Sequence, residues 1–156
     1  MGAGYHRGSS NQEVETPPDF MSAVQNVFGS IGFDLAASEK NAKAPLFFTE
    51  AMNSLEQKWH MSLLNWLNPP YANIGPWAKK CLEESQRGCK ILMLVPASVG
   101  SNWWRDYVHE KASVWFLNGR LTFVGEKHPY PKDLALILWG RTWSPGYHIW
   151  TWKNEL

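Results

Sequence analysis

The fold of this chain is best approached from the segment LLNWLNPPY, residues 63–71. The apolar run 63–67 is short enough to be a buried strand, and the two prolines must end it, because proline has no backbone N–H for a sheet ladder. A carboxamide, two rigid residues and an aromatic ring therefore follow the carboxyl end of a strand. In open α/β sheets, ligands bind at that end of the strands.

The chemistry of Asn68, Pro69, Pro70 and Tyr71 suits a planar amine. The side-chain oxygen of Asn68 and the carbonyl of Pro69 are adjacent hydrogen-bond acceptors, which fit the two hydrogens of a flat –NH2 group. Tyr71 can lie over the face of a planar ring. Because neither acceptor needs to ionise, the nitrogen lone pair stays available to attack an electrophilic carbon. The segment therefore favours alkyl transfer to nitrogen over hydrolysis.

A strand–helix–strand unit follows from the same segment. Residues 75–87 have a helical apolar stripe, and Gly88 suits the position just after a helix. Residues 90–95 are then continuously apolar up to Pro96, as expected for a strand buried on both faces of a largely parallel sheet. The sequence thus predicts an α/β fold.

The flanking segments predict further elements. Thr16 is a candidate helix cap before a helix that ends near Gly29. Strands are expected at 31–35 and 46–49, with one or two helical turns at 38–44 and a polar loop or helix at 50–59. Further on, the pattern predicts a helix at 102–108, strands at 112–117, 120–124 and 134–139, and a hairpin turn at Asn118-Gly119. Residues 140–156 show no assignable pattern.

Asn-Pro-Pro-Tyr is the motif of amino-methyltransferases, and the chain resembles the short phage-type DNA N-6-adenine-methyltransferases. The resemblance spans about residues 16–140 and is carried by 16–17, 32–38, 41–42, 48–49, 55–59, 68–71, 94–97 and 119–123. It implies a compact Rossmann-like methyltransferase domain at 16–156, a mostly parallel sheet with an antiparallel C-terminal hairpin, and no separate target-recognition domain. Residues 1–15 are expected to be a flexible arm.

The resemblance further implies methyl transfer from S-adenosylmethionine to the 6-amino group of an adenine flipped out of double-stranded DNA. Asn68, Pro69, Pro70 and Tyr71 would then be catalytic, with Tyr71 stacked on the base. The candidate cofactor-binding residues are Thr16, Pro17, Asp34, Ala36, Thr49 and Asn68, beside Phe48 and Glu50.

Asp34 is expected to accept hydrogen bonds from both ribose hydroxyls, since a carboxylate offers two oxygens at a strand end. The chain lacks the Phe-x-Gly-x-Gly loop of larger methyltransferases, so residues 34–38 replace that loop in compressed form or the cofactor site is built differently.

Without a separate target-recognition domain, the specificity for a DNA sequence must come from loops. We therefore expect low sequence specificity. The candidate DNA-binding residues are Arg105, Arg120, Lys127 and Lys132, since arginine pairs with guanine edges and lysine with phosphates.

Composition narrows the alternatives. The 156 residues carry a net charge of +1, so the chain has no overall basic signature, and its ten tryptophans are expected mostly in packing. The two cysteines indicate reduced thiols in a cytoplasmic protein, with Cys81 in the core. The histidines lack metal-ligand spacing and no apolar run can span a membrane. Three alternatives remain open: an RNA adenine substrate, a protein glutamine substrate, or a non-catalytic relative that binds nucleic acid or a partner.

Overall fold

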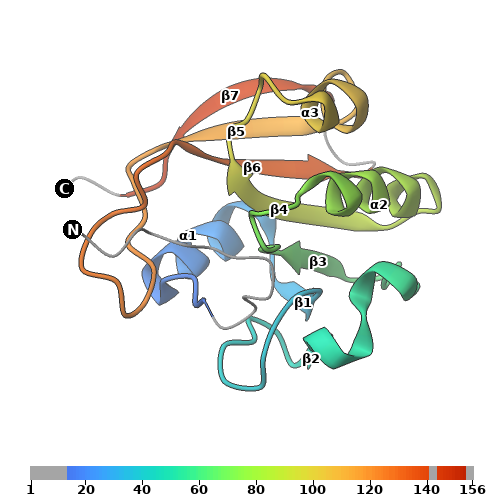
Figure 1. Ribbon diagram of the computed structural model, residues 1–156, viewed down its shortest axis with the longest axis horizontal. Helices are drawn as coiled ribbons and strands as arrows, with labels where there is room; N and C mark the ends of the chain where they lie inside the picture. The colour runs from blue at the N-terminus through green and yellow to red at the C-terminus, as the bar shows by residue number, and fades with distance from the viewer. Residues whose placement is uncertain (1–13, 141–143, 154–156) are drawn as a thin grey trace.

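The computed structural model describes residues 14–140 and 144–153, which form one seven-stranded sheet with helices on both faces (Figure 1). The strands lie in the order β2-β1-β3-β4-β6-β5-β7. In chain order the elements are α1 Pro18–Phe28, β1 Ile31–Asp34, β2 Leu46–Phe47, the 3-10 helices η1 Glu50–Met52 and η2 Ser54–Glu56, β3 Leu64–Leu67, α2 Gly75–Gln86, β4 Lys90–Pro96, α3 Asn102–Tyr107, β5 Ser113–Asn118, β6 Leu134–Trp139 and β7 Gly146–Thr151.

The sheet separates two apolar cores. One core joins α2 and α3 to one face of the central strands, through residues such as Trp77, Cys81 and Trp104. The other joins α1 and the segment 119–133 to the opposite face. Of the nine tryptophans in the described residues, six are buried, in line with their expected use in packing: Trp59, Trp66, Trp77, Trp104, Trp139 and Trp152.

The first half of the sheet is parallel, as the sequence predicts. β1 pairs in parallel with β2 and β3, and β3 pairs in parallel with β4. Residues 91–96 of β4 are buried throughout, because helices or loops cover both faces of this central strand. The predicted α/β fold with a mostly parallel sheet is therefore confirmed, and it is consistent with a Rossmann-like methyltransferase fold.

The antiparallel part of the sheet differs in detail from the prediction. β6 lies between β4 and β5 and is antiparallel to both. The expected strand at 120–124 is absent, so Asn118-Gly119 does not start a hairpin. Gly119 has a positive φ of 113° and its carbonyl accepts a hydrogen bond from the Trp152 indole, and Leu121 and Phe123 are buried beside α1. Buried and exposed residues alternate here as they do in a strand, but the buried side chains of Leu121 and Phe123 anchor a loop.

Two further segments bear on the expectations. Residues 38–42 form a single hydrogen-bonded turn, in which the Ser38 carbonyl accepts from the amides of Asn41 and Ala42. The side chains of Asn41 and Asp34 accept the amides of Ser38 and Lys43 on either side of it. β7, in the stretch without an assignable pattern, is an edge strand parallel to β5.

The ends of the chain are only partly described. Residues 1–13 lie outside the described residues, so the flexible arm stays a prediction. Glu15 is fixed to the domain, because its carbonyl accepts a hydrogen bond from the Val124 amide and its carboxylate lies 3.0 Å from Lys43 Nζ. Across the described part of the chain, every helix is too short or too polar to traverse a membrane.

Candidate active site at the carboxyl edge of the sheet

The carboxyl ends of several strands meet at one edge of the sheet. β1, β3 and β4 are mutually parallel, so Asp34, Asn68 and Pro96 lie at this edge. β5 ends there as well, since β6 is antiparallel to both β4 and β5. The segment 119–133 connects β5 to β6 and therefore lies at the same edge as residues 68–71.

The side-chain amide of Asn68 is held at both ends. Asn68 is 4% exposed, and its Nδ2 donates a 3.0 Å hydrogen bond to Thr16 Oγ1. Its Oδ1 accepts a 2.8 Å hydrogen bond from the Tyr71 hydroxyl. Thr16 is itself buried and does not cap α1, whose N-cap is Pro17 without a side-chain cap bond. The structure thus brings together two predicted site segments that are far apart in the sequence.

Tyr71 points toward the protein interior as well as toward Asn68. Its hydroxyl lies 3.2 Å from the Leu94 carbonyl, a second acceptor for its single hydrogen. Its half-buried ring meets Tyr130 edge to face, with ring centroids 5.7 Å apart at an interplanar angle of 71°. The contacts of Tyr71 are thus to the protein's own core, and stacking on a base stays a prediction.

Asp34 is buried rather than open to a ligand. Its Oδ2 accepts a 2.9 Å hydrogen bond from the Lys43 amide and its Oδ1 accepts a 3.2 Å hydrogen bond from the Ala36 amide. With 3% of its surface exposed, Asp34 organises the loop that follows β1. Its expected role toward ribose hydroxyls stays a prediction, and these contacts favour a structural role.

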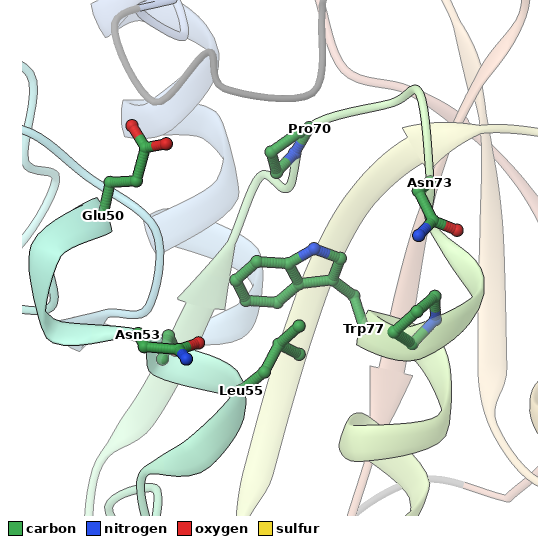
Figure 2. A pocket seen from close by; sticks show the side chains of 8 residues that line it. Glu50, Asn53, Leu55, Pro70, Asn73 and Trp77 are labelled. Atoms are coloured by element: carbon green, nitrogen blue, oxygen red, sulfur yellow. The ribbon is translucent and has the colours of Figure 1, made fainter.

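A pocket of about 240 Å³ opens beside Pro70, between the η1–η2 segment and the start of α2 (Figure 2). The Trp77 ring lies in the middle of the view, between Pro70 and Leu55, and Asn53 extends toward it from the η1–η2 side, where the Glu50 carboxylate points away from the ring. The remaining lining residues are Ser54, Asn73 and Pro76. The volume is somewhat below the roughly 300–1,000 Å³ of small-molecule pockets, so it suits part of a larger ligand.

The polar groups of this pocket differ in accessibility. The Ser54 Oγ is enclosed and has no hydrogen-bond partner among the described residues, so it reaches a ligand only if its side chain rotates. Asn53 and Asn73 are exposed and offer their amides to a ligand directly. Of the expected cofactor residues, Glu50 lines the pocket and Thr49 directly precedes it. Sequence reasoning missed Asn53, Ser54, Asn73 and the pocket role of Trp77, because no local pattern distinguishes them from loop and core residues.

The candidate DNA-binding residues differ in how far the protein already uses them. Arg105 is paired with Asp106 at 2.7 Å. The Arg120 guanidinium donates to the Pro131 carbonyl and lies 3.7 Å from Asp133, so it braces the segment 119–133. Lys127 and Lys132 are exposed on that same segment. Direct binding of DNA by these four residues stays a prediction.

A charged cluster at the C-terminal end of α2 serves the fold. Glu84 is 5% exposed and bonds to Lys80 at 2.7 Å and Arg87 at 2.6 Å. Burial raises the pKa of the Glu84 carboxyl, but the hydrogen bonds from these two cations outweigh burial and leave the pKa below its usual value. Burial also raises the pKa of the Cys81 and Cys89 thiols, and Cys81 lies in the core as predicted.

Within residues 14–140 and 144–153, no three His, Cys, Asp or Glu side chains are grouped so as to hold a metal ion.

The fold and site define an α/β protein with an oriented carboxamide beside a ligand pocket. A family model described as "DNA N-6-adenine-methyltransferase (Dam)" matches residues 7–155. The chain therefore belongs to the DNA N-6-adenine-methyltransferase (Dam) family, as the resemblance implied.

Two curated relatives agree with this assignment. A protein of Escherichia phage T1 named "DNA N-6-adenine-methyltransferase" is 29% identical over 124 residues, which are 78% of this chain and 52% of the relative. A protein of Haemophilus phage HP1 with the same name is 27% identical over 122 residues, or 76% of this chain and 70% of the relative. The chain thus spans about half the length of the first relative.

Proposed function

We propose that this protein transfers a methyl group from S-adenosylmethionine to the 6-amino group of adenine in DNA. The observation that carries the proposal is the Asn68 amide at the carboxyl end of β3, whose Nδ2 is held by Thr16 so that Oδ1 faces away as an acceptor. Membership of the Dam family and the names of both phage relatives point to adenine in DNA rather than to RNA or glutamine.

Asn68 and Pro69 would hold the amine by its two hydrogens. The Tyr71 hydroxyl has Leu94 O as an alternative acceptor, so Asn68 Oδ1 can exchange the tyrosine hydrogen for one from the amine. The Pro69 carbonyl would accept the other. As the nitrogen attacks, the N–CH3 bond would form while the C–S bond of the sulfonium breaks, and the two carbonyl dipoles would stabilise the positive charge that develops on the nitrogen. One of the two amine protons would then pass to water, which leaves the neutral methylated amine and the thioether.

The pocket beside Pro70 fits the adenosine part of S-adenosylmethionine. Trp77, Pro70 and Leu55 offer apolar surface to a ring, and Asn53 and Asn73 offer donors and acceptors. We assign the ribose hydroxyls to the exposed Glu50 carboxylate, since the Asp34 oxygens accept backbone amides. When bound, the cofactor supplies a methyl group on a sulfonium, which is already a good leaving group. The chain's contribution is alignment, and alignment of reactants can lower a barrier by several kcal/mol.

The DNA would approach the carboxyl edge of the sheet. Adenine must leave the duplex to reach Asn68, at a cost of a few kcal/mol. Lys127 and Lys132 are exposed on the segment 119–133 at this edge and would contact phosphates on either side of the flipped base. Because both relatives are phage proteins, we propose the cytoplasm of a bacterial host as the setting.

The test is to incubate the purified protein with cofactor labelled in its methyl group and with three acceptors: duplex DNA, RNA, and a glutamine-containing peptide. Digestion and mass detection should find N-6-methyl-2′-deoxyadenosine from DNA, and no N-6-methyladenosine from RNA and no methylglutamine from the peptide. Label in RNA or peptide at a higher rate would assign another acceptor. Absence of label from all three, together with no cofactor binding by calorimetry, would indicate a non-catalytic relative.

A further inference from the structure

Tyr130 connects the segment 119–133 to the Asn-Pro-Pro-Tyr motif. Tyr130 is 6% exposed and presents an edge-to-face contact to Tyr71, whose hydroxyl in turn bonds to Asn68 Oδ1. A line of three side chains therefore runs from the segment to the amide proposed to hold the substrate amine.

The position of Tyr130 is well determined by its own segment. Its amide donates a 2.7 Å hydrogen bond to the Leu121 carbonyl, and its ring meets Phe123 edge to face at 6.1 Å and 89°. Leu121 and Phe123 are fully buried. Tyr130 is thus packed against buried residues of its own segment, although residues 124–129 just before it are exposed.

We propose that Tyr130 is a positioning residue for methyl transfer, acting through Tyr71; the kinetic part of this inference rests on the proposed function. The Tyr130 ring blocks rotation of the Tyr71 ring away from Asn68. The Tyr71 hydroxyl lies at the far end of its side chain, so a small rotation of the ring displaces the hydroxyl most. The role belongs to the ring of Tyr130, which is the part in contact with Tyr71.

The contribution is expected in the chemical step. Misplacement of a reacting group by about 1 Å can lower a rate by roughly 100-fold. Loss of one supporting contact should displace Tyr71 less than that, and we expect a rate decrease of about tenfold. Affinity for DNA should change little, because Tyr130 is buried and lies behind Tyr71.

Phe28 offers a control in the same core. Its ring packs against the same cluster and meets Trp115 edge to face, with centroids 4.9 Å apart at 79°, and its ring contacts are with Trp115 and Trp150 rather than with Tyr130 or Tyr71. Tyr130→Leu and Phe28→Leu should therefore both lower stability. Only the first removes the ring that supports Tyr71, and Tyr130→Phe keeps that ring.

The experiment measures the single-turnover methylation rate and the DNA affinity of wild type, Tyr130→Leu, Tyr130→Phe and Phe28→Leu at a temperature where all four are folded. Tyr130→Leu should lose about tenfold in rate with unchanged affinity, while Tyr130→Phe and Phe28→Leu stay near wild type. Equal losses for the two leucine variants would overturn the proposal.

A second measurement does not depend on activity. The Asn68 side-chain amide resonance, assigned through its loss in Asn68→Asp, should move in Tyr71→Phe and in Tyr130→Leu, but not in Phe28→Leu. If Tyr130→Leu leaves this resonance in place, the inference is wrong, whatever the protein methylates. If the resonance moves as stated but wild type transfers no methyl group, the structural coupling stands and the proposed function fails.

Discussion

Thr16 Oγ1 and Asn68 Nδ2 lie 3.0 Å apart, although 52 residues separate them in the sequence. Both side chains are buried, so this hydrogen bond fastens the segment that precedes α1 to the carboxyl end of β3. In this arrangement the Nδ2 end of the Asn68 amide faces Thr16 and the Oδ1 end, the acceptor, faces Tyr71. The orientation that a substrate amine requires is therefore present before any ligand binds.

Thr16→Val should remove the hydrogen bond that holds the Asn68 amide in this orientation. Valine has nearly the shape of threonine but accepts no hydrogen bond, so Asn68 Nδ2 loses this partner at a cost of about 1–3 kcal/mol. We expect that loss in denaturant unfolding, and a methylation rate lowered by at least tenfold. Thr16→Ser keeps the hydroxyl and should remain close to wild type. A Thr16→Val protein with wild-type rate would show that Thr16 has no part in orienting Asn68.

Asp34→Asn and Glu50→Gln should separate fold from cofactor binding. Asparagine can accept only one of the two backbone hydrogen bonds at Asp34, so we expect about 1–3 kcal/mol of lost stability. Glu50 is exposed at the pocket, so Glu50→Gln should leave stability unchanged and raise the Kd for S-adenosylmethionine about tenfold, a difference of about 1.4 kcal/mol.

Calorimetry with the cofactor and unfolding by urea measure both quantities. If only Asp34→Asn weakened cofactor binding, the ribose hydroxyls would be assigned to Asp34 instead of Glu50.

Glu84 should make stability depend on pH in the acid range. Its pKa in the folded protein lies below the 4.5 of an unperturbed glutamate, so its contribution is present above that value and is lost as the pH falls through the folded pKa. The difference in unfolding free energy between wild type and Glu84→Gln should be constant near neutral pH and shrink below about pH 4.5. A difference that grows on acidification would contradict the ion pairs with Lys80 and Arg87.

Lys127→Ala and Lys132→Ala should weaken DNA binding without weakening the fold. Each lysine is exposed, and removal of one phosphate contact should reduce the slope of log K against log salt by about one. Lys90→Ala is the control, since Lys90 is exposed at the amino end of β4, on the opposite edge of the sheet. Equal slopes for all three variants and wild type would show that the segment 119–133 does not contact DNA phosphates.

The sequence alone predicted those features of the fold that have a local sequence pattern. The buried run ending at Asn68, the helix ending before Gly88 and the continuously apolar β4 each have their own signal, and together they predicted the parallel sheet. The motif at 68–71 likewise carries its chemistry in the residue types themselves.

The remaining features depend on contacts between distant segments. Leu121 and Phe123 alternate like a strand, yet they anchor a loop to α1 and Trp152, which no local pattern reveals. Asp34 has the position of a ribose acceptor in the sequence, but the fold of residues 36–43 directs two backbone amides at it. The proposed role of Tyr130 depends on its ring contact with Tyr71, which lies 59 residues earlier in the sequence.

The central claim is that the Asn68 amide holds the 6-amino group of adenine during methyl transfer. The most direct measurement is the amount of N-6-methyl-2′-deoxyadenosine formed per minute in duplex DNA by wild type, Asn68→Ala and Gln86→Ala, with folding checked by circular dichroism. Gln86 is an exposed carboxamide at the far end of α2 and serves as the control. We predict that Asn68→Ala binds cofactor but loses about 100-fold or more in rate, while Gln86→Ala is unchanged. A folded Asn68→Ala protein that methylates adenine at the wild-type rate would contradict the account.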